Sequence, residues 1–371
     1  MADPRLAPER RNDDPGLGTG PPPHHPAPSI QHTGRATMTV HELDLAGITD
    51  SGLRADYLKS SRLFRDIGRG RFLGRYMFPA AKRPYFDTFF SFVCYVDDLV
   101  DDVNRSLEVR KQRLDEFERA YLAACDGEEI ETDGPPSGDH VADAALSRAL
   151  VHMMRTWDLP YRDVPQFVQA QREALTTYEY ATYEEMDPFI QGVTLLPAVW
   201  INGLFEPQSE DSEELCRHTI TAFQLLDFAW DVQEDLELGR LYLPLEDLAK
   251  FGLDRTSLAR EVGSGHVSEA VRELMKFEID RAVGHLDAGR AWGRTLHPTS
   301  RTFVDLDIET HRQMAVELVK DDYAFFGRPK KGLGFNSAKI APRTAAAAAR
   351  AKRINREAEQ SGYRIRRPWS A

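Results

Sequence analysis

The sequence predicts an all-α fold, organised as a single large helical domain. Apolar residues recur at steps of three and four through most of the chain, which is the spacing of one helix face. Strand-like alternation bounded by turn residues is nearly absent, and no internal repeat with a period of roughly 20–50 residues is visible. The chain has 371 residues and is 42% hydrophobic, which is enough for a large buried core.

The first strongly periodic segment is 89–103, where Phe89, Val93, Val96, Val100 and Val103 follow the helical spacing. The segment 114–122 repeats the pattern. Further helices are expected, in order, over 141–157, 164–178, 213–236, 267–296 and 302–326. Together they assign residues 46–340 to the helical domain.

Both ends of the chain differ from this domain. Eight of the 22 prolines lie within the first 28 residues, so residues 1–45 are expected to be a disordered Pro-rich tail. Residues 341–371 form a basic Ala/Arg-rich tail, in which five alanines at 345–349 precede Arg350, Lys352, Arg353 and Arg356. This tail could form a basic helix with a weak apolar face, so we expect at most peripheral membrane contact.

Charge and cysteine content restrict the function further. The net charge is −12, and residues 46–340 alone carry −16, which argues against a nucleic-acid partner. The acids either hold divalent cations or make a soluble surface. Three scattered cysteines form neither a disulfide framework nor a zinc site, and no secretory or membrane-spanning segment is apparent. We therefore expect a cytoplasmic protein.

The first of two informative acidic runs ends the apolar segment that begins at Phe89. Asp97 and Asp101 lie four residues apart and share a helix face, as do Asp98 and Asp102. The helix is apolar on nearly every side just before these acids, which implies that it is buried.

The second run places Asp227, Asp231 and Asp235 in one row, with Glu234 beside it. Like charges at this spacing repel by about 0.2–0.5 kcal/mol per pair even when exposed, and by more where water is scarce. A solvated acidic face is the plain alternative, but two such rows on apolar helices favour a bound cation. All the ligands are oxygen atoms, which favours Mg²⁺, an ion that takes one or two carboxylates plus substrate phosphates.

These rows predict a diphosphate bridged by Mg²⁺ between two facing acidic helices. A metal-neutralised diphosphate is a good leaving group, and an allylic one departs to give a carbocation. The cation needs a dry cavity in which each aromatic face contributes about 0.5–2 kcal/mol. Several of the neighbouring aromatic side chains are expected to line it: Phe89, Phe92, Tyr95, Phe223, Phe228 and Trp230.

The same segments resemble the squalene/phytoene synthase family, whose members join prenyl diphosphates on an all-α fold. Residues 97–101, preceded by Phe78-Pro79 and Lys82-Arg83, look like the family's "LP…RR…DDIVD". Residues 224–244 look like "QLxNIxRDxxEDxxxGRxYLP", which is the more specific signal, and residues 180–185 resemble "RYxTFxEL". The likeness covers roughly residues 55–335.

The resemblance implies an isoprenoid-synthase-type domain around a central cavity, with Mg²⁺ as cofactor and an allylic prenyl diphosphate as substrate. It implies that four aspartates hold the metal and carry the catalysis, and we add Asp227 as a fifth metal ligand. The four are Asp97, Asp101, Asp231 and Asp235. Diphosphate binding at the cavity mouth is expected from Arg240, Tyr242, Arg69 and Arg71.

The chain also departs from the family pattern. Cys94 and Trp230 stand where the family has arginines, and Asp227 stands where it has an asparagine. The family's small-residue helix is replaced by residues 189–197, and the "GMxxD" stretch lacks its aspartate at 170–174. These changes remove positive charge and room from a site that must hold two prenyl diphosphates.

On this basis the sequence narrowly favours transfer of one prenyl group to a small-molecule, non-prenyl acceptor in specialised metabolism. Trp230 would stack on such an acceptor if it is aromatic, and is therefore counted with the catalytic residues. The close alternative is head-to-head condensation of two prenyl diphosphates. Cyclisation of a single donor by a class I terpene cyclase and a catalytically idle subunit are further alternatives. Donor length, acceptor and oligomeric state stay open.

Overall fold

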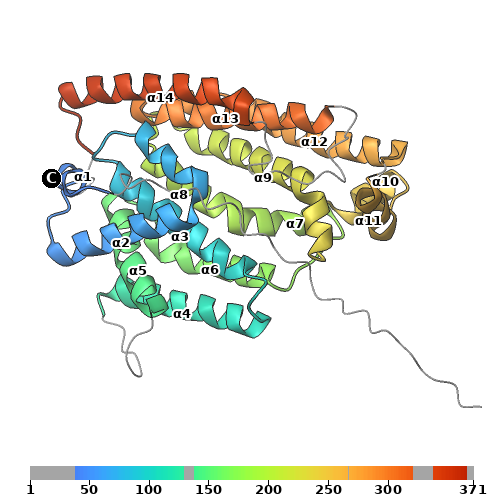
Figure 1. Cartoon of the computed structure of the whole chain (residues 1–371), viewed down its shortest axis with the longest axis horizontal. Coiled ribbons are helices and arrows are strands. Elements are labelled where there is room, and N and C mark those ends of the chain that lie inside the picture. The colour runs from blue at the N-terminus through green and yellow to red at the C-terminus, as the bar shows by residue number, and fades with distance from the viewer. Residues whose placement is uncertain (1–37, 129–137, 266, 321–336, 366–371) are drawn as a thin grey trace, which may run out of the picture. The chain divides into compact units, whose positions relative to one another are not determined.

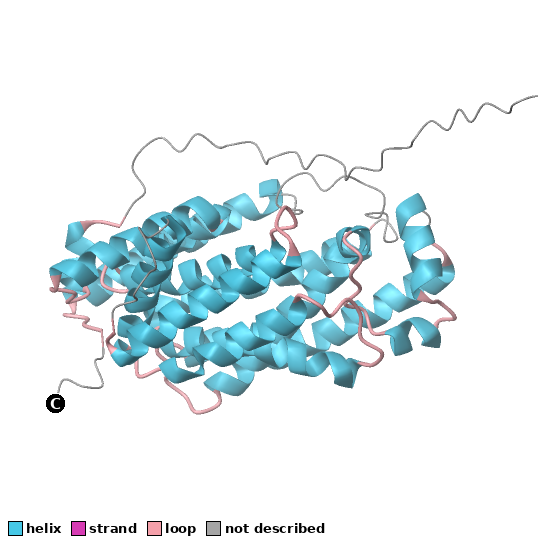
Figure 2. Ribbon diagram, turned by 90° about the horizontal axis from the view of Figure 1, so that it is seen from below, coloured by secondary structure: helices cyan, strands magenta, loops and turns pink. Residues whose placement is uncertain are grey.

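A computed structural model describes residues 38–128, 138–265, 267–320 and 337–365, and confirms the all-α prediction (Figure 1). Within these ranges no strand forms, and two isolated bridges join Glu179 to Leu241 and Pro207 to Leu296. Helices drawn side by side with short loops at their ends account for nearly all of the described chain (Figure 2).

The described elements follow in chain order. The α-helices are α1 Val40–Leu45, α2 Ser51–Ile67, α3 Arg83–Asp101, α4 Leu107–Asp126, α5 Gly138–Thr156, α6 Val164–Ala174, α7 Tyr183–Phe189, α8 Leu196–Leu204, α9 Ser212–Glu237, α10 Leu245–Lys250, α11 Arg255–Ser264, α12 Glu269–Gly289, α13 Pro298–Val319 and α14 Ser337–Gln360. Four shorter helical segments are η1 Arg69–Met77, η2 Tyr161–Asp163, η3 Ile190–Leu195 and η4 Trp292–Thr295.

Several helix starts are fixed by their first polar residue. The side chains of Asp50, Ser106, Thr182 and Ser268 each accept a hydrogen bond from a backbone N–H in the first turn. Such a cap contributes about 1 kcal/mol, because it satisfies a donor that has no partner within the helix. At the other end of α4, Gly127 adopts a left-handed conformation with φ of 75°, which glycine tolerates best.

The two helices that carry the acidic runs lie inside the packed body. Helix α3 packs against α2, α5 and α6, and α9 packs against α12, α8 and α13. Phe92 of α3 is fully buried and contacts the rings of Phe117 and Phe167. Burial of a side chain of this size contributes about 1.5–3 kcal/mol, so each acidic end is held on a rigid support.

The segment that replaces the family's small-residue helix is irregular. Pro188 lies inside α7, and the helix widens directly afterwards into the π-helical segment η3 before it resumes as α8. A proline lacks the N–H that a regular helix needs and crowds the preceding turn. Short π segments often occur at functional sites, and this one turns Val193 and Thr194 toward the cavity described below.

The last part of the segment predicted to be disordered contains a helix. Residues 40–45 form α1, which is capped by Thr39, and its Glu42 is buried against two arginines. Glu42 accepts hydrogen bonds from Arg75 at 2.8 Å and from Arg83 at 3.0 Å. The prolines on which the prediction rested all lie within residues 1–28. These residues, like 29–37, lie outside the described part of the chain.

The basic C-terminal segment forms the predicted helix, α14, and packs on α13 and η1. Its inner face buries Ala351 and Asn355, whose amide donates to the carbonyl of Met77 at 3.1 Å. Beyond the helix, the Tyr363 hydroxyl donates to Glu206 at 2.8 Å. Among the helices within the described ranges, none combines the length and hydropathy that crossing a bilayer requires.

Candidate functional site

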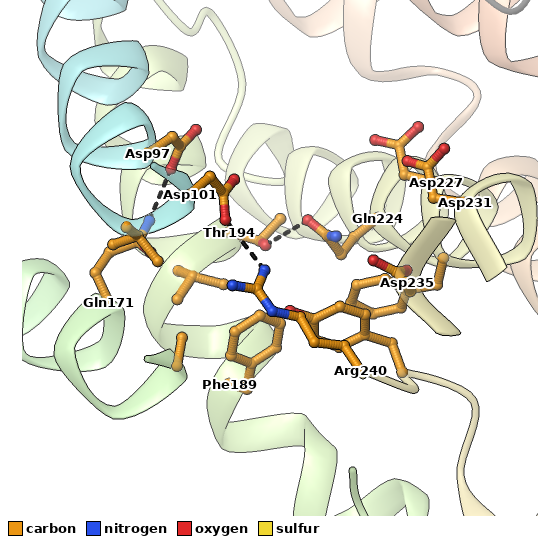
Figure 3. A pocket seen from close by; sticks show the side chains of 15 residues that line it. Asp97, Asp101, Gln171, Phe189, Thr194, Gln224, Asp227, Asp231, Asp235 and Arg240 are labelled. Atoms are coloured by element: carbon orange, nitrogen blue, oxygen red, sulfur yellow. Dashed lines mark hydrogen bonds and ion pairs between the residues drawn. The ribbon is translucent and has the colours of Figure 1, made fainter. Parts of the chain in front are cut away.

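A cavity of about 290 Å³ opens between α3, α6, η3 and α9, and all five predicted metal ligands line it (Figure 3). Asp97 and Asp101 point in from α3, and Asp227, Asp231 and Asp235 face them from α9. The remaining lining residues are Val100, Gln171, Ala174, Phe189, Val193, Thr194, Gln224, Phe228, Arg240 and Tyr242.

Only one of the two acidic rows of α3 reaches this cavity. Asp98 and Asp102 lie about a quarter turn round the helix and line a separate pocket with Arg105 and Arg113. Arg105 forms an ion pair with Asp102 at 2.9 Å. The row that faces the cavity is therefore Asp97 and Asp101.

Asp97 is held by a side chain that the sequence analysis did not predict as a site residue. Its carboxylate accepts a hydrogen bond from the amide of Gln171, on α6, at 2.8 Å. Burial, and to a smaller extent the neighbouring charge of Asp101, raise the pKa of Asp97 to a net value of about 7. Arg71 and the Gln171 hydrogen bond act in the opposite direction.

In the row on α9, the pKa of a carboxyl is raised in the same way. Asp227 lines the cavity from α9, and its side chain is exposed there. Desolvation by the surrounding protein and repulsion from Asp231 raise the pKa of Asp227, the charges of His311 and Arg71 lower it, and the net value is about 6. A bound cation would relieve this repulsion.

Helix α13 adds two polar residues behind Asp227 that were not predicted. The ring of His311 stacks on Phe223 with centroids 3.5 Å apart, and its Nδ1 lies 2.9 Å from the backbone oxygen of Asp307. The pKa of Asp307 is raised by burial and lowered by the charges of His311 and Arg71. The four-residue spacing of Asp307 and His311 was the available signal, but it marks a great many exposed helices as well.

Arg240 lies at the cavity edge, as expected, and links the two acidic helices. It follows Gly239, which ends the turn after α9 with φ of 78°, and its backbone N–H donates to the Asp235 carbonyl at 2.7 Å. Its guanidinium donates to Asp101 of α3 at 3.1 Å. Asp101 is 63% exposed, so this pair closes the rim rather than the floor of the cavity.

Arg71, in η1, does not line the cavity, but it is a second cation whose charge acts on the site. Its charge lowers the pKa of Asp97 and of Asp227, so it acts on both acidic helices at once. It also lies beside Cys94, where burial raises the thiol pKa and Arg71 opposes that rise. Arg71 thus brings a guanidinium from another element to the position at which the family's arginine is missing. Arg69 begins η1, and its side chain lies outside the described part of the chain.

The aromatic wall of the cavity differs from the predicted set. Phe228 lines it as expected, stacked on Tyr242 with centroids 4.6 Å apart, and Phe189 from α7 stacks on Tyr242 at 5.4 Å. Trp230 is not among the lining residues and packs against the hydrophobic core instead. The remaining predicted wall residues also lie outside the lining: Phe89, Phe92, Tyr95 and Phe223.

The basic pair at the start of α3 has a structural part in the fold. Lys82 is fully buried and donates to Glu206 at 2.6 Å and to Ser300 at 2.9 Å. Arg83 donates to the carbonyl of Phe78 at 3.0 Å as well as to Glu42. Both side chains are therefore committed to contacts inside the packed body.

The donor set of the cavity fits Mg²⁺. Five carboxylates from two helices supply oxygen ligands alone, and desolvation together with their mutual repulsion raises the pKa values of Asp97 and Asp227. In the ranges that the structure describes, no three His, Cys, Asp or Glu side chains converge into a ready-made metal cage. Mg²⁺ suits that spacing, because it binds through one or two carboxylates and completes its shell with water and substrate phosphates.

Comparisons with known proteins agree with this geometry. A family model described as squalene/phytoene synthase matches residues 64–336. The phytoene synthase of Arthrospira platensis is 27% identical over 69% of this chain and 82% of its own length. The 15-cis-phytoene synthase of Synechocystis sp. is 28% identical over 69% of this chain and 74% of its own.

Solved structures support the fold. A squalene synthase of Alicyclobacillus acidocaldarius superposes with a TM-score of 0.64 at 24% identity, over 75% of this chain and 98% of the other. A dehydrosqualene synthase in complex with ligand also gives a TM-score of 0.64, at 17% identity, over 84% of this chain and 98% of the other. At these identities the likeness concerns the arrangement of helices.

Proposed function

The chain belongs to the squalene/phytoene synthase family and is a prenyltransferase, and we propose that it condenses two allylic prenyl diphosphates head to head. The observation that carries this proposal is the pair of acidic helices, α3 and α9, that face each other across one cavity with Arg240 and Arg71 beside them. Two acidic rows with a cation at either side suit two diphosphate groups.

This proposal adopts the alternative of the sequence analysis in place of its narrow favourite. The two curated relatives described above are named phytoene synthases. Transfer to an aromatic acceptor rested on Trp230, which packs on the core, and on two missing arginines. Arg71 offsets one of these losses at Cys94. The acceptor we propose is therefore a second prenyl diphosphate.

The proposed reaction balances without a reductant. Two C–O bonds break and release two diphosphates, the two C1 carbons become joined, and two protons are lost to leave a double bond. When bound, Mg²⁺ would neutralise the charge that builds up on the leaving diphosphates. The ligands that would hold it are Asp97, Asp101, Asp227, Asp231 and Asp235.

The chain's own groups would orient and shield the substrates. Arg240 and Arg71 would bind the diphosphate oxygens by charge-assisted hydrogen bonds. The stacked rings of Phe189, Phe228 and Tyr242 line the cavity beside the acids, where ring faces stabilise a carbocation by about 0.5–2 kcal/mol each. These rings also keep water from the cation.

The test is product analysis with the full chain, Mg²⁺ and either farnesyl or geranylgeranyl diphosphate as the sole organic substrate. We expect a hydrocarbon with twice the carbon number of the donor and two diphosphates released per product. Turnover that needs an added aromatic acceptor would overturn the proposal in favour of single-donor transfer. A cyclic product of donor length would identify a terpene cyclase, and binding without turnover an idle subunit.

A further inference from the structure

Helices α9 and α12 pack against each other (Figure 1), and two histidines face each other across that contact. His218 lies in the second turn of α9 and His285 near the end of α12, and their Nδ1 atoms are 3.1 Å apart. The ring centroids are 5.3 Å apart and the ring planes are inclined at 44°, so the nitrogen edges meet rather than the flat faces. Neither histidine lines the acidic cavity, and the proposed condensation uses neither.

The two helices are held in register at this contact. The hydroxyl of Thr219, next to His218, donates to the carbonyl of Gly289 at 3.0 Å, and Gly289 lies one turn beyond His285. A Cβ atom on Gly289 would lie only 2.2 Å from the Thr219 hydroxyl oxygen, so glycine permits this close approach. The backbones that carry the two imidazoles are therefore fixed before any ligand binds, and little freedom is lost when one does.

The facing atoms are imidazole nitrogens, which are common ligands of transition metals. A neutral imidazole offers one N–H group and one lone pair, so two facing Nδ1 atoms either share a proton or direct both lone pairs at one cation. Two bonds of about 2.0–2.1 Å to Zn²⁺, at an angle of roughly 90–110°, place the nitrogens about 2.8–3.4 Å apart. The observed separation of 3.1 Å lies within that interval, so both imidazoles can bind one ion with little movement.

The surroundings favour the neutral form of His285 and leave the pair within reach of water. Burial lowers the pKa of His285, and so do the charges of His218 and Arg281, so its ring carries a lone pair at neutral pH. The guanidinium of Arg281 donates to Asp247 at 2.8 Å and to Glu278 at 2.7 Å, so its donors are used there. Both imidazoles are half-buried, which leaves an ion between them open to water on one side.

We propose that His218 and His285 chelate one divalent transition-metal ion that prefers imidazole, such as Zn²⁺ or Cu²⁺, between α9 and α12. Water completes its coordination, because no third His, Cys, Asp or Glu side chain joins the pair within the described ranges. The ion links two helices that only the folded chain brings together, so it stabilises the folded state. The site is separate from the acidic cavity, whose oxygen ligands suit Mg²⁺, and it does not depend on the proposed condensation.

The test is isothermal titration of Zn²⁺ into the full chain with excess Mg²⁺, which competes for the acidic cavity. The chain carries His24→Ala/His25→Ala, because these two adjacent histidines near the N-terminus are another source of imidazole. We expect one Zn²⁺ per chain, with an affinity that falls about tenfold or more in His218→Gln and in His285→Gln, since each variant leaves a single imidazole. Glutamine keeps a hydrogen-bonding group at the position, and thermal unfolding without metal checks that each variant folds.

Two further measurements report on the ligands themselves. Zn²⁺ should raise the unfolding temperature of the chain with both histidines, and should not raise that of either glutamine variant. Electron paramagnetic resonance with one equivalent of Cu²⁺ should show coupling to two nitrogens in the former and to one nitrogen in His285→Gln. His41→Gln is the matched control, because His41 is exposed on α1, and it should change the Zn²⁺ affinity by less than about twofold.

Three results would overturn the proposal. No binding of Zn²⁺, or an affinity that is unchanged in both glutamine variants, would mean that the two rings only share a hydrogen bond. Loss of Zn²⁺ binding in Asp231→Asn alone would place the ion in the acidic cavity. Product formation, measured with Mg²⁺ and without a transition metal, tests the proposed function independently.

Discussion

Helices α3 and α9 carry acids at the same four-residue spacing, yet their carboxylates meet different surroundings. On α3 the two cavity acids accept hydrogen bonds from other elements, Asp97 from Gln171 and Asp101 from Arg240. On α9, Asp227 lies under the charges of His311 and Arg71 and beside the like charge of Asp231. Side-chain donors from α6 and from the turn after α9 thus hold the α3 row in position, while the charges of His311 and Arg71 act on Asp227 of the α9 row.

The largest effect is expected from the α9 row. Asp231→Asn should lower the rate of diphosphate release about a thousandfold, because it removes negative charge where Mg²⁺ would be held. Circular dichroism and thermal unfolding check that the fold is kept. Asp98→Asn is the matched control, since Asp98 faces the other pocket, and it should cost less than about threefold. Similar rates for the two variants would mean that facing the cavity does not distinguish Asp231 from an acid outside it.

The second largest effect is expected at the ion pair between Arg240 and Asp101 on the cavity rim. Arg240→Ala should lower kcat/KM about 10- to 100-fold, which corresponds to the loss of one charge-assisted hydrogen bond to diphosphate. Arg240→Lys should restore part of the loss, because it returns the charge without the planar fork. Steady-state kinetics on the purified variants measure both. An unchanged kcat/KM in Arg240→Ala would mean that the pair with Asp101 only holds the rim together.

The pKa of Asp97, in the α3 row, predicts how metal binding and activity depend on pH. The pKa of Asp97 is about 7, so Mg²⁺ must displace a proton below that pH, and its apparent affinity should fall up to about tenfold per pH unit below 7. The Gln171 hydrogen bond lowers this pKa, so Gln171→Ala should raise it and move the acid limb of activity to higher pH. Gln169→Ala, on the exposed side of α6, should leave the limb unchanged. An acid limb of the pH–activity profile that shifts to lower pH in Gln171→Ala would contradict the assignment.

The smallest effect is expected at Trp230. Because this side chain packs on the core, Trp230→Phe should change the rate of diphosphate release by less than about twofold while lowering thermal stability slightly. A loss of tenfold or more with unchanged stability would place the indole ring against a substrate. That result would revive transfer to an aromatic acceptor.

Much of the site could be predicted, because the acids repeat along helices. Residues four apart share a face, so Asp97 with Asp101, and Asp227 with Asp231, could be grouped without a structure. The same geometry bears on Trp230: one residue before Asp231, it lies about 100° round the helix from the acidic row, and it does not line the cavity. Its predicted part in catalysis stays a prediction.

The residues that were missed depend on how separate elements pack. Gln171 reaches Asp97 because α6 lies against α3, and Phe189 lines the cavity from the last position of α7, a helix distant in sequence from both acidic runs. His311 comes behind Asp227 from a helix more than 80 positions further along the chain. No periodic pattern within one segment carries that information. Arg71 was expected, but its relation to Cys94 could not be read from a short 3₁₀ segment.

The central claim is that the α3 and α9 acids bind diphosphate together through Mg²⁺. Isothermal titration of inorganic diphosphate into the full chain, with and without Mg²⁺, tests it most directly. We predict binding only with Mg²⁺, weakened about tenfold or more by Asp97→Asn on α3 and also by Asp231→Asn on α9. Binding that is equally tight without Mg²⁺, or that survives unchanged in either variant, would contradict the account.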